Sequence, residues 1–178
     1  MNEDGPLRPG RVALFGIALT AASVDLATKA LAEAFLPDMT RPVLPFLSLD
    51  LHYNRGVSFS MFQAQTGFGL AVLLLVQAAG TAVMTWWMLV ARSALERIAL
   101  ALIAGGALGN LLDRMDEGAV TDFLVLHPFG WGLFTSNLAD KFISVGVLLL
   151  LIDAAHRALL PRTGAGRHPN AARGEARP

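Results

Sequence analysis

Residues 105–140 have the sequence GGALGNLLDRMDEGAVTDFLVLHPFGWGLFTSNLAD, and this stretch decides both the fold and the site. It begins inside an apolar run, leaves that run at Asn110 and Asp113, crosses a polar loop containing Asp122, and re-enters apolar sequence at Asp140. Ionisable groups at the edge of hydrocarbon are costly, so they are rare there and usually face a protein interior or a water-filled cavity. The stretch is therefore where we expect the functional site.

The composition indicates a membrane protein. The 178 residues suggest a single domain. Hydrophobic residues make up 54% of the chain and charged residues 16%, with a mean hydropathy of +0.52, which is too apolar for a soluble globule of this size. The absence of Cys excludes structural disulfides, thiolate zinc sites and a catalytic thiol. The four His residues are scattered, so we expect neither a metal nor a cofactor.

Apolar runs predict four membrane-spanning helices, at about residues 12–36, 67–91, 98–113 and 138–160. The first run also fits a secretory signal, with a basic start and a small-residue segment. We favour a retained span, because its 25 residues can cross a core of ~30 Å and three more spans follow.

Two features of the spans concern how they pack. Ala101, Gly105 and Gly109 lie four residues apart, a spacing of small side chains that lets membrane helices approach closely. Asp25 and Lys29 lie i, i+4 in the first span, with the acid before the base, which favours an inward-facing structural ion pair.

The segment between the first two spans predicts β structure. Three Pro residues break any helix there, and residues 47–54 alternate between apolar and polar side chains, as in a half-buried strand. We expect a small β region over about 43–62 with 119–125, at the membrane surface, because open sheet edges cannot lie in lipid. The predicted fold is an all-α membrane protein of four transmembrane helices with this small β element.

The basic residues set the predicted orientation. Nine of the 14 Lys and Arg residues lie in the two tails and in the connection at 92–97, so the positive-inside rule places both termini in the cytoplasm. The polar groups of the spans then gather at the outer end. Residues 1–160 form one integral membrane domain, and residues 161–178, rich in Gly, Pro, Arg and Ala, are predicted to be a disordered cytoplasmic tail.

The chemistry that these residues can supply is carboxylate chemistry. Two close Asp side chains hold one proton between them; the ionised one can take a proton from water while the other hydrogen-bonds a scissile carbonyl. Asp113, Asp122 and Asp140 are candidates. Asp113 is suited to a charge pair with Arg114, which favours Asp122 with Asp140 modestly and leaves the other pairings open. A Ser136–Lys141 nucleophile and base is less favoured, because an interfacial Lys usually reaches for phosphate.

Five motifs, in order, resemble the lipoprotein signal peptidase (signal peptidase II) family. They are Asp25-Leu-Ala-Thr28-Lys29, Asn54-Arg-Gly56-Val-Ser-Phe59-Ser60, the run from Gly105 to Arg114, Asp122-Phe123, and Asn137-Leu-Ala139-Asp140. Together they span residues 25–140. The sequence departs from the family pattern at Ser58, Ser136 and Lys141, which concerns the substrate pocket more than the reaction.

The resemblance implies an aspartyl endopeptidase of the bacterial cytoplasmic (inner) membrane. It would cleave the signal peptide of diacylglyceryl-modified prolipoproteins just before the lipid-modified Cys, at the outer (periplasmic) side, with Asp122 and Asp140 as the catalytic pair. The implied partners are prolipoproteins and membrane lipids, without nucleic acid, and the chain would be a monomer. The residues implied to bind substrate or support the site are Asp25, Lys29, Asn54, Gly56, Gly109, Asn110, Asp113, Arg114, Asn137 and Ala139.

Two other classes of function compete with this hypothesis. A small proton-coupled carrier would also embed charged residues in a Gly-containing bundle, but carriers place ion sites near the midplane and show paired repeats. A non-catalytic assembly subunit would tolerate an Asp→Glu change at residues 122 and 140, which a catalytic pair held in tight geometry would not.

Overall fold

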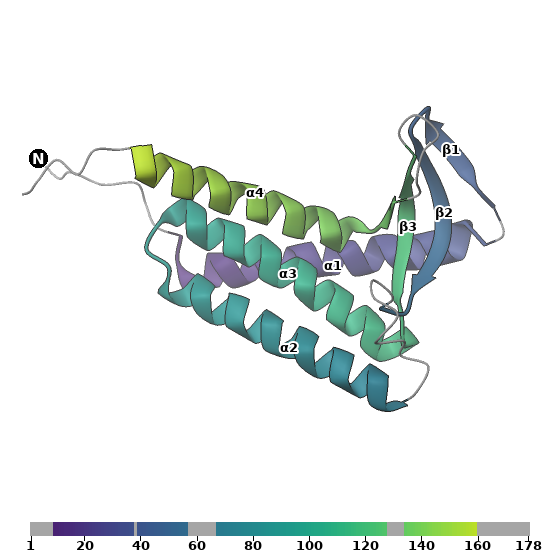
Figure 1. Ribbon diagram of the computed structural model, residues 1–178, viewed down its shortest axis with the longest axis horizontal. Helices are drawn as coiled ribbons and strands as arrows, with labels where there is room; N and C mark the ends of the chain where they lie inside the picture. The colour runs from purple at the N-terminus through teal and green to yellow at the C-terminus, as the bar shows by residue number, and fades with distance from the viewer. Residues whose placement is uncertain (1–8, 38, 57–66, 128–133, 160–178) are drawn as a thin grey trace, which may run out of the picture.

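The computed structural model describes residues 9–37, 39–56, 67–127 and 134–159. In this part of the chain, four helices lie side by side and a small antiparallel sheet lies at one end of them (Figure 1). The start of α1 and the end of α4 lie at the opposite end (Figure 1). Helix α3 is central, because it contacts each of the other three helices. The helices are α1 (Arg11–Phe35), α2 (Gly67–Val90), α3 (Ala94–Glu117) and α4 (Leu138–Leu159).

Three helices, α1, α2 and α3, are long and apolar enough to cross a membrane by length and composition. Helix α4 is not among these candidate spans of the described chain, so a fourth span stays a prediction. Helix α3 is longer than the expected 98–113 at both ends. Ser93 caps its start by accepting a hydrogen bond from Glu96 N, and Gly118 ends it in the left-handed conformation at φ 69°. These caps let the helix continue through polar residues that hydropathy had assigned to loops.

Small residues bring the helices close together. A Cβ added to Gly105 would overlap the Ala18 carbonyl oxygen of α1, and one added to Gly106 would lie 2.5 Å from the Ala139 carbonyl oxygen of α4. The spacing of small residues in α3 therefore does what the sequence predicts, on two neighbouring faces of the same helix.

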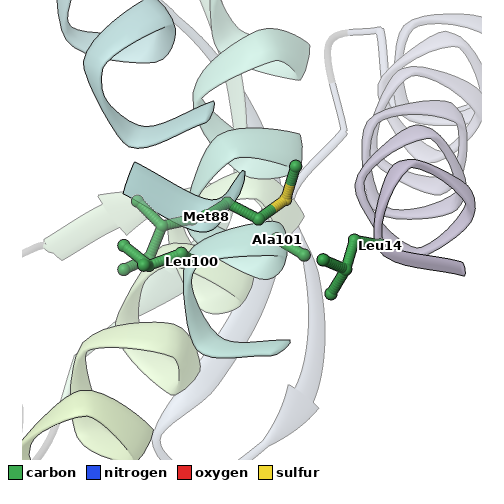
Figure 2. Close-up of a cluster of buried hydrophobic side chains, with 5 residues drawn as sticks. Leu14, Met88, Leu100 and Ala101 are labelled. Carbon is green, nitrogen blue, oxygen red and sulfur yellow. The ribbon is translucent and has the colours of Figure 1, made fainter. Parts of the chain in front are cut away.

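The apolar core lies where α1, α2 and α3 meet. Leu14, Met88, Leu100 and Ala101 are fully buried and belong to one cluster drawn from the three helices (Figure 2). Polar contacts add to this packing near the α2–α3 turn.

Two of these polar contacts involve side chains at or near the α2–α3 turn. Trp87 Nε1 donates to Glu96 Oε1 at 3.0 Å, and Ser93 Oγ donates to Asp153 Oδ1 at 2.7 Å. The first links α2 to α3, and the second links the cap of α3 to α4.

The sheet has the order β1-β2-β3-β4, with antiparallel neighbours. Its strands are β1 (Arg41–Leu44), β2 (Leu47–Asn54), β3 (Val120–Leu126) and β4 (Phe134–Ser136). The alternating segment 47–54 is a strand, as expected, and it pairs with the predicted partner segment. The expected β region, about 43–62, includes only the second half of β1, and β4 was not predicted; residues 57–62 of that region lie outside the described residues. β1 is an edge strand, which is where a sheet tolerates a Pro such as Pro42.

The contact of Gly105 with α1 generates the first prediction. Gly105→Ala would force α1 and α3 apart and should destabilise the protein by about 1–3 kcal/mol, the usual cost of overpacking. The measurement is the thermal midpoint in detergent. Gly80→Ala is the matched control, because a Cβ at Gly80 meets nothing within 4 Å and Ala is the better helix former. Equal midpoints for the two variants would contradict the close contact.

Candidate active site

The predicted site residues come together where the sheet meets the helices, and Lys29 of α1 lies at their centre. Its side chain is 2% exposed. Lys29 Nζ lies 2.8 Å from Asp25 Oδ2 and 3.0 Å from Asp113 Oδ2, and it donates to Asn110 Oδ1 at 2.8 Å. A buried ammonium is tolerable only when it is paired and hydrogen-bonded in this way. Two of these three contacts, with Asp113 and Asn110, tie α1 to α3, and the third lies within α1.

Two asparagines connect this cation to Asp122 and Asp140. Asn110 Nδ2 donates to Asp140 Oδ1 at 3.0 Å. Asn137 Nδ2 donates to Asp122 Oδ1 at 2.7 Å and to Asn110 Oδ1 at 3.0 Å. The two acids come from distant parts of the chain, yet they belong to one hydrogen-bond network bridged by adjacent amides.

Asp140 is positioned by the start of α4. Asp140 N donates to Asn137 Oδ1 at 3.1 Å, and Asn137 N donates to Asp140 Oδ2 at 3.4 Å, which is a reciprocal cap. Asp25 Oδ1 accepts a hydrogen bond of 2.7 Å from Ala139 N in the same turn.

Asp122 lies in β3 and is 2% exposed. Besides the bond from Asn137, its Oδ2 accepts one of 3.2 Å from Asn54 Nδ2. Burial raises the pKa of Asp122 most, and the charge of Asp140 raises it further, while the hydrogen bonds from Asn54 and Asn137 act in the opposite direction. Asp122 is therefore the acid that holds a proton more readily than an ordinary Asp does.

Asn54 is held by a tight turn at the end of β2. Its Oδ1 accepts a hydrogen bond of 2.9 Å from Gly56 N, and Gly56 has φ +88°, a conformation that L side chains rarely adopt. A Cβ at Gly56 would also lie 2.7 Å from the Leu73 side chain of α2. Gly56 thus acts through Asn54. Gly109 gives similar room to Asp25, whose Oδ2 would lie 2.6 Å from an added Cβ.

The structure gives Asp113 a different partner from the one expected. We expected a charge pair with Arg114, but Asp113 pairs with Lys29, and Arg114 Nη1 donates to Gln77 Oε1 of α2. Consecutive residues of a helix do not face each other, which is the reason for the difference. A structural role for Asp113 stays a prediction, now with Lys29 and Thr121 as its partners.

Sequence reasoning missed three residues of the site. They are Gln77, Thr121 and Glu33. Gln77 Oε1 accepts a hydrogen bond from Arg114 Nη1. Thr121 N donates to Asp113 Oδ2 at 2.7 Å, and Thr121 Oγ1 donates to Glu33 Oε1 at 2.8 Å. Glu33 carried a signal, since it lies one turn after Lys29 on the same face of α1. Thr121 carried none beyond its place before Asp122.

The arrangement is compatible with hydrolytic chemistry. Two carboxylates in one network, one buried and one at a helix start, can divide the roles of proton donor and proton acceptor around a water molecule. Among the described residues, no group of three or more His, Cys, Asp or Glu side chains is arranged to hold a metal ion.

Comparison with known proteins gives the family. The family model described as signal peptidase (SPase) II matches residues 17–156. The lipoprotein signal peptidase of Methylobacterium radiotolerans is 41% identical over 152 residues, which cover 83% of this chain and 88% of that protein. The lipoprotein signal peptidase of Methylorubrum extorquens is 42% identical over 139 residues, which cover 75% and 81%.

A solved structure shares the fold. A bacterial membrane enzyme determined by the in meso method at 2.3 Å resolution superposes with a TM-score of 0.75 and 21% identity, over 90% of this chain and 98% of that one. The family model and these relatives show that the chain, a bacterial membrane protein, belongs to the signal peptidase II family of aspartic-type peptidases.

Proposed function

We propose that this peptidase removes the signal peptide from diacylglyceryl-modified bacterial prolipoproteins and cleaves just before the lipid-modified Cys, with Asp122 and Asp140 as the catalytic pair. The observation that carries this proposal is the bridging of the two acids by Asn110 and Asn137. The two relatives named above are lipoprotein signal peptidases, which supports the substrate class.

The environments of the two acids suggest how they divide the work. Asp140, half-buried at the start of α4, is the ionised member and takes a proton from the attacking water. Asp122, whose pKa is raised by burial, holds the shared proton and donates it to the scissile carbonyl. The water oxygen bonds to the carbonyl carbon and gives a tetrahedral intermediate. Asp140 then passes its proton to the leaving nitrogen as the C–N bond breaks, and Asp122 recovers the carbonyl proton.

The other network residues would hold this pair in place. Lys29 offsets the charge of Asp25 and Asp113, and it orients Asn110 toward Asp140. Asn110 contacts Asp140 directly, and Asn137 contacts both proposed catalytic acids. Asp25, Lys29, Gly109 and Ala139 act one step further away, as scaffold.

The proposed membrane placement follows from charge and exposure. With α4 as a fourth span and both termini in the cytoplasm, the sheet end of the bundle faces the periplasm of the inner membrane. Val43, Leu44 and Phe46, in β1 and the following turn, are exposed apolar residues at this end, and they could rest on the outer leaflet from which a diacylglyceryl chain enters. The protein needs no second copy to complete the acid pair, which suits a monomer.

Replacing either acid tests the proposed pair. Asp122→Asn and Asp140→Asn should each abolish cleavage of a diacylglyceryl-modified precursor by the purified protein, because neither variant can complete both proton transfers. The thermal midpoints in detergent should stay close to that of the unaltered protein. Asp50→Asn is the matched control, because Asp50 lies in β2 against His52 and outside the network. Turnover by either site variant at the rate of the control would remove the assignment.

The pH dependence tests which acid holds the proton. The rate should fall at high pH as Asp122 loses its proton. The hydrogen bond from Asn54 favours ionised Asp122, so Asn54→Ala should raise the pKa of Asp122 and move the alkaline limb of kcat/KM to higher pH. The measurement is the pH profile of cleavage. A shift to lower pH, or none, would refute Asp122 as the proton holder.

A further inference from the structure

We infer that Thr121 and Glu33 are positioning residues of this peptidase, and that together with Asp113 they form a clasp that sets Asp122 relative to Asp140. The inference rests on the proposed function, because it assigns a task to the strand that carries Asp122.

The clasp fastens β3 to two helices through a single residue. Thr121 is fully buried. Its Oγ1 donates to Glu33 Oε1 of α1 at 2.8 Å and lies 3.5 Å from Asp113 Oδ1 of α3, and its backbone N donates to Asp113 Oδ2 at 2.7 Å. A threonine between two carboxylates is thus held from both the hydroxyl and the amide.

The geometry of a strand passes this constraint to Asp122. Consecutive side chains of a strand point to opposite faces. Because the Thr121 side chain points toward the helices, the Asp122 side chain points toward Asn54 and Asn137. A slip of one residue would exchange the two faces. The β2–β3 register is irregular between Leu49 and His52, and His52 pairs with Asp122. The ladder is therefore interrupted beside the acid, and the clasp supplies a second fixed point.

The same clasp is connected to Asp140. Asp113 Oδ2, which receives Thr121 N, also lies 3.0 Å from Lys29 Nζ. Lys29 donates to Asn110, and Asn110 donates to Asp140 at 3.0 Å. The side chains of Lys29 and Asn110 therefore connect Asp113, which holds β3, to Asp140 of α4. Movement of Thr121 would change the placement of Asp122 against this frame.

Glu33 can be replaced to test the clasp with little disturbance of the packing. It is half-buried, and with Lys29 and Asp113 it lines a pocket of about 390 Å³ between α1 and α3. Truncation of Glu33 would enlarge this open pocket and would leave no sealed cavity in the core. The carboxylate can thus be altered with little effect on packing.

The experiment compares hydroxyl removal with hydroxyl retention in the full-length protein. Thr121→Val keeps the shape and the backbone N–H and removes the bond to Glu33. It should lower kcat for a diacylglyceryl-modified precursor by about 10- to 100-fold, the usual effect of misplacing a reacting group, with KM little changed. Thr121→Ser keeps the hydroxyl and should restore most of kcat. Thr85→Val, which removes a hydroxyl bonded to Thr81 O within α2, is the matched control and should retain kcat.

Three results would overturn the clasp: an unchanged kcat for Thr121→Val, equal losses for the Val and Ser variants, or a loss confined to KM. Should Thr121→Val fail to fold, Glu33→Ala decides the matter against Glu33→Gln, which keeps an oxygen acceptor. A lower kcat for the Ala variant alone supports the clasp, and equal rates refute it. Asp122→Asn belongs in the same assay, because activity there would remove the proposed function, whereas an inactive Asp122→Asn beside a fully active Thr121→Val removes the clasp alone.

Discussion

The structure depends on one buried cation. Lys29 places an ammonium group inside a bundle of apolar helices, where an unpaired charge would cost several kcal/mol. Asp25, Asp113 and Asn110 surround it, and each of these side chains has a second contact, with α4, with β3 or with Asp140. The requirement to satisfy one charge therefore fixes the relative placement of three helices and a strand.

Close packing of the helices makes this network possible. Gly106 lets α3 approach the first turn of α4, and Gly109 leaves room for the carboxylate of Asp25. Larger side chains at these places would separate the helices and lengthen every hydrogen bond between them. Small residues on α3 thus do two tasks, since they pack the apolar face and bring the polar groups within bonding distance.

Much of the fold could be predicted from the sequence, because it depends on patterns of neighbouring residues. The apolar runs indicate the helices, alternation in residues 47–54 indicates β2, and the spacing of Asp25 and Lys29 indicates an ion pair, which the structure confirms. The family resemblance is confirmed by the comparisons. The ends of α3 were missed, because Ser93 and Gly118 act through capping geometry that hydropathy does not measure.

Contacts between distant segments were harder to predict. Glu33 and Thr121 meet only because α1 and β3 are brought together by the rest of the fold, and the preference of Asp113 for Lys29 over Arg114 depends on which way each helix face points. Strands β1 and β4 are short and carry little pattern of their own. The roles of Asp122 and Asp140 stay predictions that rest on the motifs and the shared network.

The order of the strands has a consequence for biosynthesis. Strand β2 is made before α2 and α3, yet its inner neighbour β3 follows both helices in the chain. Closing so long a loop is slow and entropically costly, so β2 cannot pair with β3 until two more helices have been translated. Asn137 and Asp140 come later still. A nascent chain therefore lacks the complete network around Asp122 and Asp140 until α4 has begun.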